Sequence, residues 1–267
     1  MRKTFALVAL LAAAVFVVPA SQAITDGEVD GNNHPHVGLM IAEDANGVPM
    51  WRCSGTLLSP TVFLTAGHCV EAPAANIEIW FLSGSPNQIG AADGYPTNGQ
   101  VSGTPQVDPN FDFPFRDVGV VLLDAPWNTP GNVYGTLPTL NQLDSLKTKR
   151  GQQDVWFTAV GYGLQKSFPT PADFQESRLR TRMVAYPKLN QINVPGFVGD
   201  FSMLLSNNAN TGGTCFGDSG GPNFLGSSNV VAGVTSYGIN GNCAGTGGVF
   251  RMDRQWALDF VTPFLAP

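Results

Sequence analysis

A serine surrounded by glycines stands out near the C-terminal end of the 267-residue sequence. The stretch 212–222 reads GGTCFGDSGGP, with Ser219 near its centre and Asp218 directly before it. So many glycines predict a tight turn whose backbone N–H groups can face one point. A serine hydroxyl is a weak nucleophile near neutral pH, so it needs a base and a third group that orients the base. The stretch therefore predicts nucleophilic chemistry at Ser219.

Two other motifs supply candidates for the base and the orienting group. His68 lies in the run Thr-Ala-Gly-His-Cys, and histidine often transfers protons near neutral pH. Asp117 opens an apolar run, 118–123, that is expected to form a buried strand. A buried carboxylate is costly unless paired, and one that faces an imidazole holds the ring in the required tautomer. Asp117 is therefore preferred to its rivals Asp112, in a loop, and Asp124, in a turn.

Together these motifs resemble those of the chymotrypsin and trypsin family of serine proteases. Their order along the chain is His, Asp, Ser, which differs from the order in subtilisins and in α/β-hydrolases. The resemblance spans nearly the whole chain after residue 23 and implies that His68, Asp117 and Ser219 are catalytic. It also implies an oxyanion hole formed by the N–H groups of Gly217 and Ser219. The implied function is a secreted serine endopeptidase, with an esterase or a catalytically silent binding protein on the same fold as alternatives.

The resemblance further implies where the substrate side chain before the scissile bond binds. The corresponding positions are Gly213, Thr214, Ser236, Tyr237, Gly238 and Gly248. Trypsin-like members carry an aspartate where this chain has Gly213, and its absence removes the charge that selects Arg or Lys. Since Gly238 and Gly248 leave the walls open, we expect an uncharged pocket for large apolar or aromatic residues. Tyr237 stands where the family usually has Trp.

The chain contains four cysteines. In an exported protein they predict two disulfides, and their number alone allows three pairings. The resemblance implies the pairs Cys53–Cys69 and Cys215–Cys243. The first pair would hold the residue next to His68 in place.

Residues 1–23 have the layout of a secretory signal peptide. Two basic residues, Arg2 and Lys3, precede an uncharged apolar run over 5–18 that is too short to span a bilayer comfortably. Small residues follow, and cleavage could occur after Ala20 or after Ala23. We therefore expect a secreted, extracellular protein whose protease domain covers 24–267.

The choice of cleavage site affects activation. In the resembled family, a new N-terminal isoleucine inserts into the protein and its ammonium pairs with the aspartate before the nucleophile. Cleavage after Ala23 would expose the amine of Ile24, and Asp218 would be its partner. Thr25 and Asp26 depart from the family's usual sequence after the isoleucine.

Charge and composition limit the partners. The chain has 14 basic and 20 acidic residues, a formal charge of −6, and without Arg2 and Lys3 it has 12 basic and 20 acidic residues. An acidic protein lacks the basic surface that nucleic acids require. We expect protein or peptide substrates, possible proteinaceous inhibitors, no nucleic acid, no membrane contact after signal cleavage, and a monomer. No cofactor or metal is expected; His34 and His36 have no accompanying cluster of carboxylates or cysteines.

Many short strand-like runs separated by turn signals predict an all-β protein built from barrels. Between 71 and 115, the only predicted strand is 77–82. The resemblance implies two six-stranded antiparallel β-barrels, the first over about 24–130 and the second over about 131–252, with the site between them. A short helix is predicted over about 253–262, with Asp253 as its N-cap, Pro263 as its stop, and the second barrel as its packing surface.

Overall fold

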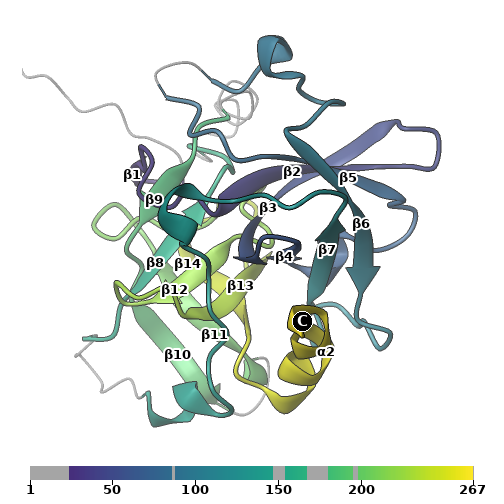
Figure 1. The fold of residues 1–267 in the computed structure, drawn as a ribbon. Helices are drawn as coiled ribbons and strands as arrows, with labels where there is room; N and C mark the ends of the chain where they lie inside the picture. Colours follow the sequence, from purple (N-terminus) through teal and green to yellow (C-terminus); the bar gives the residue numbers. More distant parts are fainter. Residues whose placement is uncertain (1–23, 86–87, 147–153, 167–179, 195–197, 267) are drawn as a thin grey trace, which may run out of the picture.

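The computed structural model describes residues 24–85, 88–146, 154–166, 180–194 and 198–266. The predicted signal peptide lies outside these residues, as does the start of the strand-like run at 178–179. Strands dominate the described part, and they form a closed barrel and a second sheet (Figure 1).

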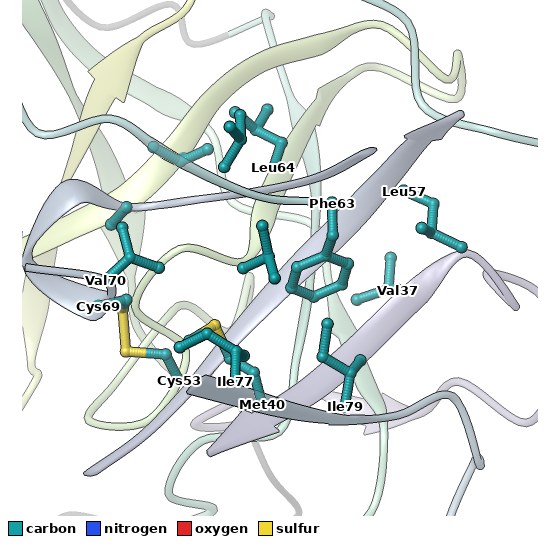
Figure 2. Close-up of a cluster of buried hydrophobic side chains, with 14 of the residues drawn as sticks. Val37, Met40, Cys53, Leu57, Phe63, Leu64, Cys69, Val70, Ile77 and Ile79 are labelled. Atoms are coloured by element: carbon teal, nitrogen blue, oxygen red, sulfur yellow. A yellow bond between two sulfur atoms is a disulfide. The ribbon is translucent and has the colours of Figure 1, made fainter. Parts of the chain in front are cut away.

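The first unit is a closed antiparallel barrel with the strand order β2-β3-β4-β7-β6-β5. Its strands are β2 (Val37–Glu43), β3 (Pro49–Ser59), β4 (Val62–Thr65), β5 (Asn76–Trp80), β6 (Val101–Val107) and β7 (Gly119–Leu123). Apolar side chains from these strands fill the interior, and Figure 2 shows Phe63 beside Val37 and Ile79. Burying this apolar surface favours the folded state by roughly 25 cal/mol per Å².

The prediction of a single strand between 71 and 115 is wrong, because β6 also lies in this region. It pairs with β5 on one side and β7 on the other, although it contains Gly103 and Pro105. Both residue types argue against a strand interior when only the sequence is considered. A Cβ at Gly103 would lie 2.5 Å from the carbonyl oxygen of Leu122, so the glycine lets the two strands approach closely.

The second unit is an antiparallel sheet with eight strands among the described residues, in the order β1-β9-β8-β12-β13-β14-β11-β10. Its strands are β1 (Glu28–Val29), β8 (Phe157–Gly161), β9 (Met183–Ala185), β10 (Leu189–Val194), β11 (Gly199–Asn207), β12 (Pro222–Leu225), β13 (Val231–Gly238) and β14 (Gly245–Arg251). The predicted all-β, chymotrypsin-like architecture is confirmed. The second unit differs in detail, since β1 and β10 extend a sheet for which six strands were expected.

The C-terminal helix, α2 (Gln255–Leu265), is present, but its bounds differ from those predicted. Arg254 occupies the N-cap position, because the Asp253 carboxylate instead accepts hydrogen bonds from Arg251 and from the N–H of Leu143. Pro263 lies inside the helix and does not stop it.

The helix also packs against a larger surface than predicted. Ala257 and Val261 are fully buried in a cluster that contains the first-barrel core together with Phe250 and Met252 from the end of the second sheet. The ring of Trp256 contacts that of Phe250, with 5.0 Å between their centroids. The helix therefore helps to hold the two units together, beside the point marked C in Figure 1.

A buried arginine also joins the two units. Arg182, directly before β9, lies 2.8 Å from the carboxylate of Asp30, and neither side chain is exposed. Its guanidinium donates to the carbonyl oxygens of Val37 and Phe81, each at 3.1 Å, and to the hydroxyl of Tyr162 at 3.2 Å. Leaving such a buried charge without its partner typically costs about 3 to 5 kcal/mol.

His36 lies next to this network without joining it. The side chain is fully buried, and neither ring nitrogen has a hydrogen-bond partner among the described residues. Its ring packs against that of Phe224, with 5.4 Å between centroids. Burial, reinforced by the nearby His34 and Arg182, lowers the pKa of His36 to about 4. The Nδ1 atom of His34 is hydrogen-bonded to the carboxylate of Asp30.

His36 is therefore expected to make folding sensitive to acid. Its pKa is near 6.5 in the unfolded chain and about 4 in the folded protein, so the unfolded state binds more protons between these values. Stability falls as the pH drops through this range. His36→Leu should reduce the loss of unfolding free energy between pH 7 and pH 4 by about 3 kcal/mol. Urea unfolding at both pH values measures this, and an unchanged pH dependence in the variant would contradict it.

Candidate active site

The ends of two neighbouring strands bring His68 and Asp117 together. Thr65 of β4 pairs with Gly119 of β7, so the residues just after β4 lie beside those just before β7. His68 follows β4 in a short 3-10 turn, η1 (Gly67–Cys69). Its Nδ1 lies 2.9 Å from Oδ2 of Asp117 and 3.1 Å from Oδ1, and its backbone N–H donates to Oδ1 at 2.9 Å.

The second sheet provides a further donor to this carboxylate. The hydroxyl of Ser236, in β13, donates to Oδ2 of Asp117, which is completely buried. The His68 side chain remains 23% exposed, so it can meet a ligand. The two rival aspartates have other contacts: Asp124 accepts from the hydroxyl of Ser102, and the carbonyl oxygen of Asp112 accepts from the N–H of Arg116.

The stretch 212–222, which contains Ser219 and is called the serine-containing loop below, docks against the same end of the first barrel. Gly220 has a φ of +76°, and a Cβ there would lie 2.0 Å from Oγ1 of Thr65 and 2.8 Å from the nitrogen of Ala66. Only glycine allows this contact, which places the residue after Ser219 against the chain leading into His68.

Ser54 strengthens the docking of this loop, and sequence reasoning missed it. Its backbone N–H donates to the carbonyl oxygen of Ser219 at 2.8 Å, and its hydroxyl donates to that of Gly217 at 2.9 Å. The same hydroxyl accepts from the N–H of Tyr162 at 3.0 Å. Its position beside Cys53 was the only sequence signal that could have drawn attention to it.

His68 and Ser219 line one pocket of about 550 Å³. Its other lining residues are Glu71, Phe111, Phe113, Thr214, Cys215, Phe216, Thr235, Ser236, Tyr237, Gly238 and Cys243. Four of the six residues predicted to bind the substrate side chain are among them. The aromatic residues before Asp117 were not predicted here, although the ring of Phe113 lies edge-on to that of His68, with 5.5 Å between centroids.

The other two predicted pocket residues, Gly213 and Gly248, do not line this pocket. A Cβ at Gly213 would lie 2.4 Å from the side chain of Asn207, and one at Gly248 would lie 2.2 Å from the ring of Tyr237. The Tyr237 hydroxyl shares a hydrogen bond of 2.8 Å with the hydroxyl of Ser202. The Tyr237 ring therefore covers Gly248.

Backbone donors are available beside Ser219. The N–H groups of Asp218, Gly220 and Gly221 all donate to backbone carbonyl oxygens. Within the described part of the chain, those of Gly217 and Ser219 have no such acceptor. Gly217 has a φ of +93°, a conformation that side chains disfavour.

The carboxylate of Asp218 faces the interior. It accepts hydrogen bonds from the N–H of Gly163 at 2.7 Å and from that of Cys215 at 2.9 Å. Complete burial raises its pKa to about 7, although both hydrogen bonds act in the opposite direction. The positive charge of Arg52 also lowers this pKa, but the effect of burial is larger.

Ile24 is already seated in the second unit. Its side chain is fully buried with Ala159, Met183 and Ala185. The next residue, Thr25, forms a β-bridge with Gly213, five positions before Asp218. The residues predicted to form the activation pair thus lie in connected parts of one unit.

Both predicted disulfides, Cys53–Cys69 and Cys215–Cys243, are present. Among the described residues, the one close group of potential metal ligands is Cys53, His68 and Cys69. Because these two sulfur atoms are joined in a disulfide, they are not available as thiolates for a metal.

Comparison with solved structures supports the fold class. The solved structure of HL collagenase superposes with a TM-score of 0.65 at 18% identity, over 90% of this chain and 96% of the other. Human heparin binding protein superposes with a TM-score of 0.61 at 16% identity, again over 90% and 96%. The barrel, the second sheet and the terminal helix define a protein of the chymotrypsin fold.

The sequence comparisons identify the family. The Trypsin family model matches residues 26–254. A venom serine protease, Bi-VSP, from Bombus ignitus is 25% identical in an alignment of 227 residues that covers 80% of this chain and 60% of that protein. Brachyurin from Leptuca pugilator is 27% identical in an alignment of 216 residues that covers 79% of this chain and 84% of brachyurin. The chain belongs to the trypsin family of serine proteases, and its match spans only 60% of the venom protease. No helix in its described part is long and apolar enough to cross a membrane.

The packing around Asp218 gives a test of this site. A Cβ at Gly163 would lie 2.5 Å from the Asp218 carboxylate, so Gly163→Ala should displace that group and destabilise the protein by about 1 to 3 kcal/mol. Gly241→Ala is the matched control, because no atom lies within 4 Å of a Cβ at that position. Denaturant unfolding compares the two variants, and equal midpoints would contradict the predicted packing.

Proposed function

We propose that this protein is a secreted serine endopeptidase in which Ser219, His68 and Asp117 form the catalytic triad. The observation that carries the proposal is the contact of a fully buried carboxylate with His68, in a pocket that Ser219 also lines. Its family membership supports the same chemistry. The match of residues 1–23 to a signal peptide supports export.

In the proposed reaction, the Ser219 oxygen attacks the carbonyl carbon of a peptide bond while Nε2 of His68 takes the hydroxyl proton. Asp117 accepts a hydrogen bond from Nδ1–H, which leaves Nε2 unprotonated and ready to act as the base. The same carboxylate stabilises the imidazolium that forms. His68 then gives the proton to the leaving amine, and a water molecule hydrolyses the acyl-enzyme by the same steps.

The N–H groups of Gly217 and Ser219 are the proposed oxyanion donors. Negative charge develops on the carbonyl oxygen as Ser219 attacks, and these donors would stabilise that charge. Losing one such donor typically costs about 3 to 4 kcal/mol of transition-state stabilisation.

The pocket favours an uncharged side chain before the scissile bond. Its walls combine Phe111, Phe113 and Phe216 with the small or neutral Thr214 and Gly238. Among the described residues that line it, Glu71 is the one acidic residue and none is Lys or Arg. We therefore propose a preference for large apolar or aromatic residues. Protein or peptide substrates, and inhibitors that bind as substrates do, would enter here, and we expect the protein to be a monomer.

Activation is proposed to follow cleavage after Ala23. The released amine of Ile24 would supply a positive charge for the buried Asp218, whose carboxylate accepts hydrogen bonds from the backbone N–H groups of Gly163 and Cys215. Because Asp218 lies between Gly217 and Ser219, the pairing would fix the orientation of both oxyanion donors.

Hydrolysis of a peptide library tests the triad and the pocket together. The wild-type protein should cleave after Phe, Tyr or Leu at least about 10-fold faster than after Arg or Glu. The reason is that burying one unpaired charge costs more free energy than a 10-fold difference in rate represents. Ser219→Ala should lower kcat by about 10⁵-fold or more, and Asp117→Asn by about 10⁴-fold. Asp124→Asn is the matched control and should retain activity. Cleavage that survives in Ser219→Ala would refute the proposal.

A second experiment tests activation. Protein that begins at Ile24 should be active, and protein that begins at Ser21 should lose most of its activity, because breaking a buried ion pair typically costs about 3 to 5 kcal/mol. Activity of the Ile24 form should also fall as the pH rises beyond about 8, where an α-amino group loses its proton. N-terminal sequencing of the secreted protein gives the natural start. A fully active protein that begins at Ser21 would disprove this mechanism.

A further inference from the structure

The active-site pocket has two walls, and each comes from a different unit of the fold. His68, Glu71, Phe111 and Phe113 belong to the first unit, and the other lining residues belong to the second. The four lining residues that were predicted to bind the residue before the scissile bond are all in the second-unit wall. A cavity of about 550 Å³ is in the range that holds a drug-sized ligand, so it exceeds one amino-acid side chain. The first-unit wall can therefore meet a neighbouring residue of the substrate.

The proposed reaction indicates which residue this is. His68 gives its proton to the nitrogen of the leaving amine, so this nitrogen must come within hydrogen-bond distance of the ring. The residue that carries the nitrogen is the first one after the scissile bond. Glu71 is three positions after His68 in the sequence and lines the same pocket. The side chain of the first residue after the scissile bond therefore enters the part of the pocket that Glu71 lines.

The carboxylate of Glu71 is available to a ligand. The backbone carbonyl oxygen of Glu71 accepts a hydrogen bond from the N–H of Ala74 at 3.0 Å, whereas its side chain forms no hydrogen bond or ion pair with any described residue. Arg116, the cation of the loop before Asp117, binds Asp108 instead, with 2.7 Å between Nη2 and Oδ2. The Glu71 side chain is partly exposed, so a substrate can reach it.

Two aromatic rings share this wall with Glu71. Phe113 is 49% exposed, and Phe111 is partly exposed. The face of an aromatic ring attracts a cation, and the apolar stem of Lys or Arg packs on such surfaces while its charged head stays beside polar groups. A neutral residue would take water from the Glu71 carboxylate without replacing it, and an acidic residue would be repelled. The wall therefore suits a long side chain with a positive charge at its end.

We propose that Glu71 gives the enzyme a preference for lysine or arginine as the first residue after the scissile bond. The ammonium or guanidinium faces the Glu71 carboxylate, and the stem packs on Phe113. The protein thus cleaves between a large apolar or aromatic residue and a basic one. This inference rests on the proposed endopeptidase function and adds a preference on the leaving-group side.

A set of matched peptides tests the inference. All carry Phe before the scissile bond, and they carry Lys, Met or Glu directly after it, since Met is a long side chain without the charge of Lys. In the wild-type protein, kcat/KM should be about 5-fold or more higher for Lys than for Met, as expected for a partly exposed charge pair, and lowest for Glu. Glu71→Gln should bring the Lys/Met ratio to about 1, and Glu71→Asp should keep part of the preference because the charge remains. Asp200→Asn removes an exposed acid elsewhere and should keep the wild-type ratio and activity.

A second pair of peptides tests the side of the scissile bond. These peptides carry Lys or Met at the second residue before the bond, where the wild-type Lys/Met ratio should be about 1. A preference for Lys found there and not after the bond would overturn the inference. A wild-type ratio of about 1 after the bond, or an unchanged ratio in Glu71→Gln, would also overturn it.

The outcomes separate this inference from the proposed function. Equal cleavage of the Lys and Met peptides by the wild-type protein overturns the inference and leaves the endopeptidase proposal intact. If the wild-type protein cleaves no peptide faster than Ser219→Ala does, the proposed function fails, and the inference fails with it. The wild-type comparison decides the question even if Glu71→Gln does not fold.

Discussion

The carboxylate of Asp117 is the interaction on which the rest of the site depends. Burying a charged group without partners is prohibitively costly, and Asp117 is completely buried. Its donors come from both units. The ring and the backbone N–H of His68 come from the first unit, just after β4, and the hydroxyl of Ser236 comes from the second sheet. The charge is therefore satisfied only when the two units are correctly docked. The same docking brings Ser219 to the pocket that His68 lines.

Small residues make this docking possible. Gly220 presses its backbone against Thr65, and Ser54 binds two carbonyl oxygens of the serine-containing loop. Farther from the pocket, Arg182 binds backbone and side-chain oxygens from several segments, and α2 packs on residues of both units. The relative position of the units is thus determined by several separate contacts. A shift at the interface would disturb the serine-containing loop as well as the buried carboxylate.

Sequence reasoning identified the features that depend on local chemistry. Ser219 lies among glycines, and Asp117 heads an apolar strand, so each could be recognised from its neighbours. It missed features that depend on contacts between distant segments. The strand β6 contains Gly103 and Pro105 and is stabilised by the strands that pair with it on both sides. Ser54 has a role only because the serine-containing loop, which is distant in the sequence, packs against it. The residue type at Gly248 suggested an open wall, but only the packed structure shows that the Tyr237 ring occupies the adjacent space.

The central claim is that the buried carboxylate, the imidazole and the hydroxyl act as one nucleophilic unit. Mapping the site of modification by a fluorophosphonate tests this most directly, because the reagent bonds to an activated serine oxygen. Mass spectrometry of the digested wild-type protein should find one phosphonylated residue, Ser219, and the modification should be slowed strongly in His68→Ala. Modification of another residue, or an unchanged rate without the imidazole, would contradict the account.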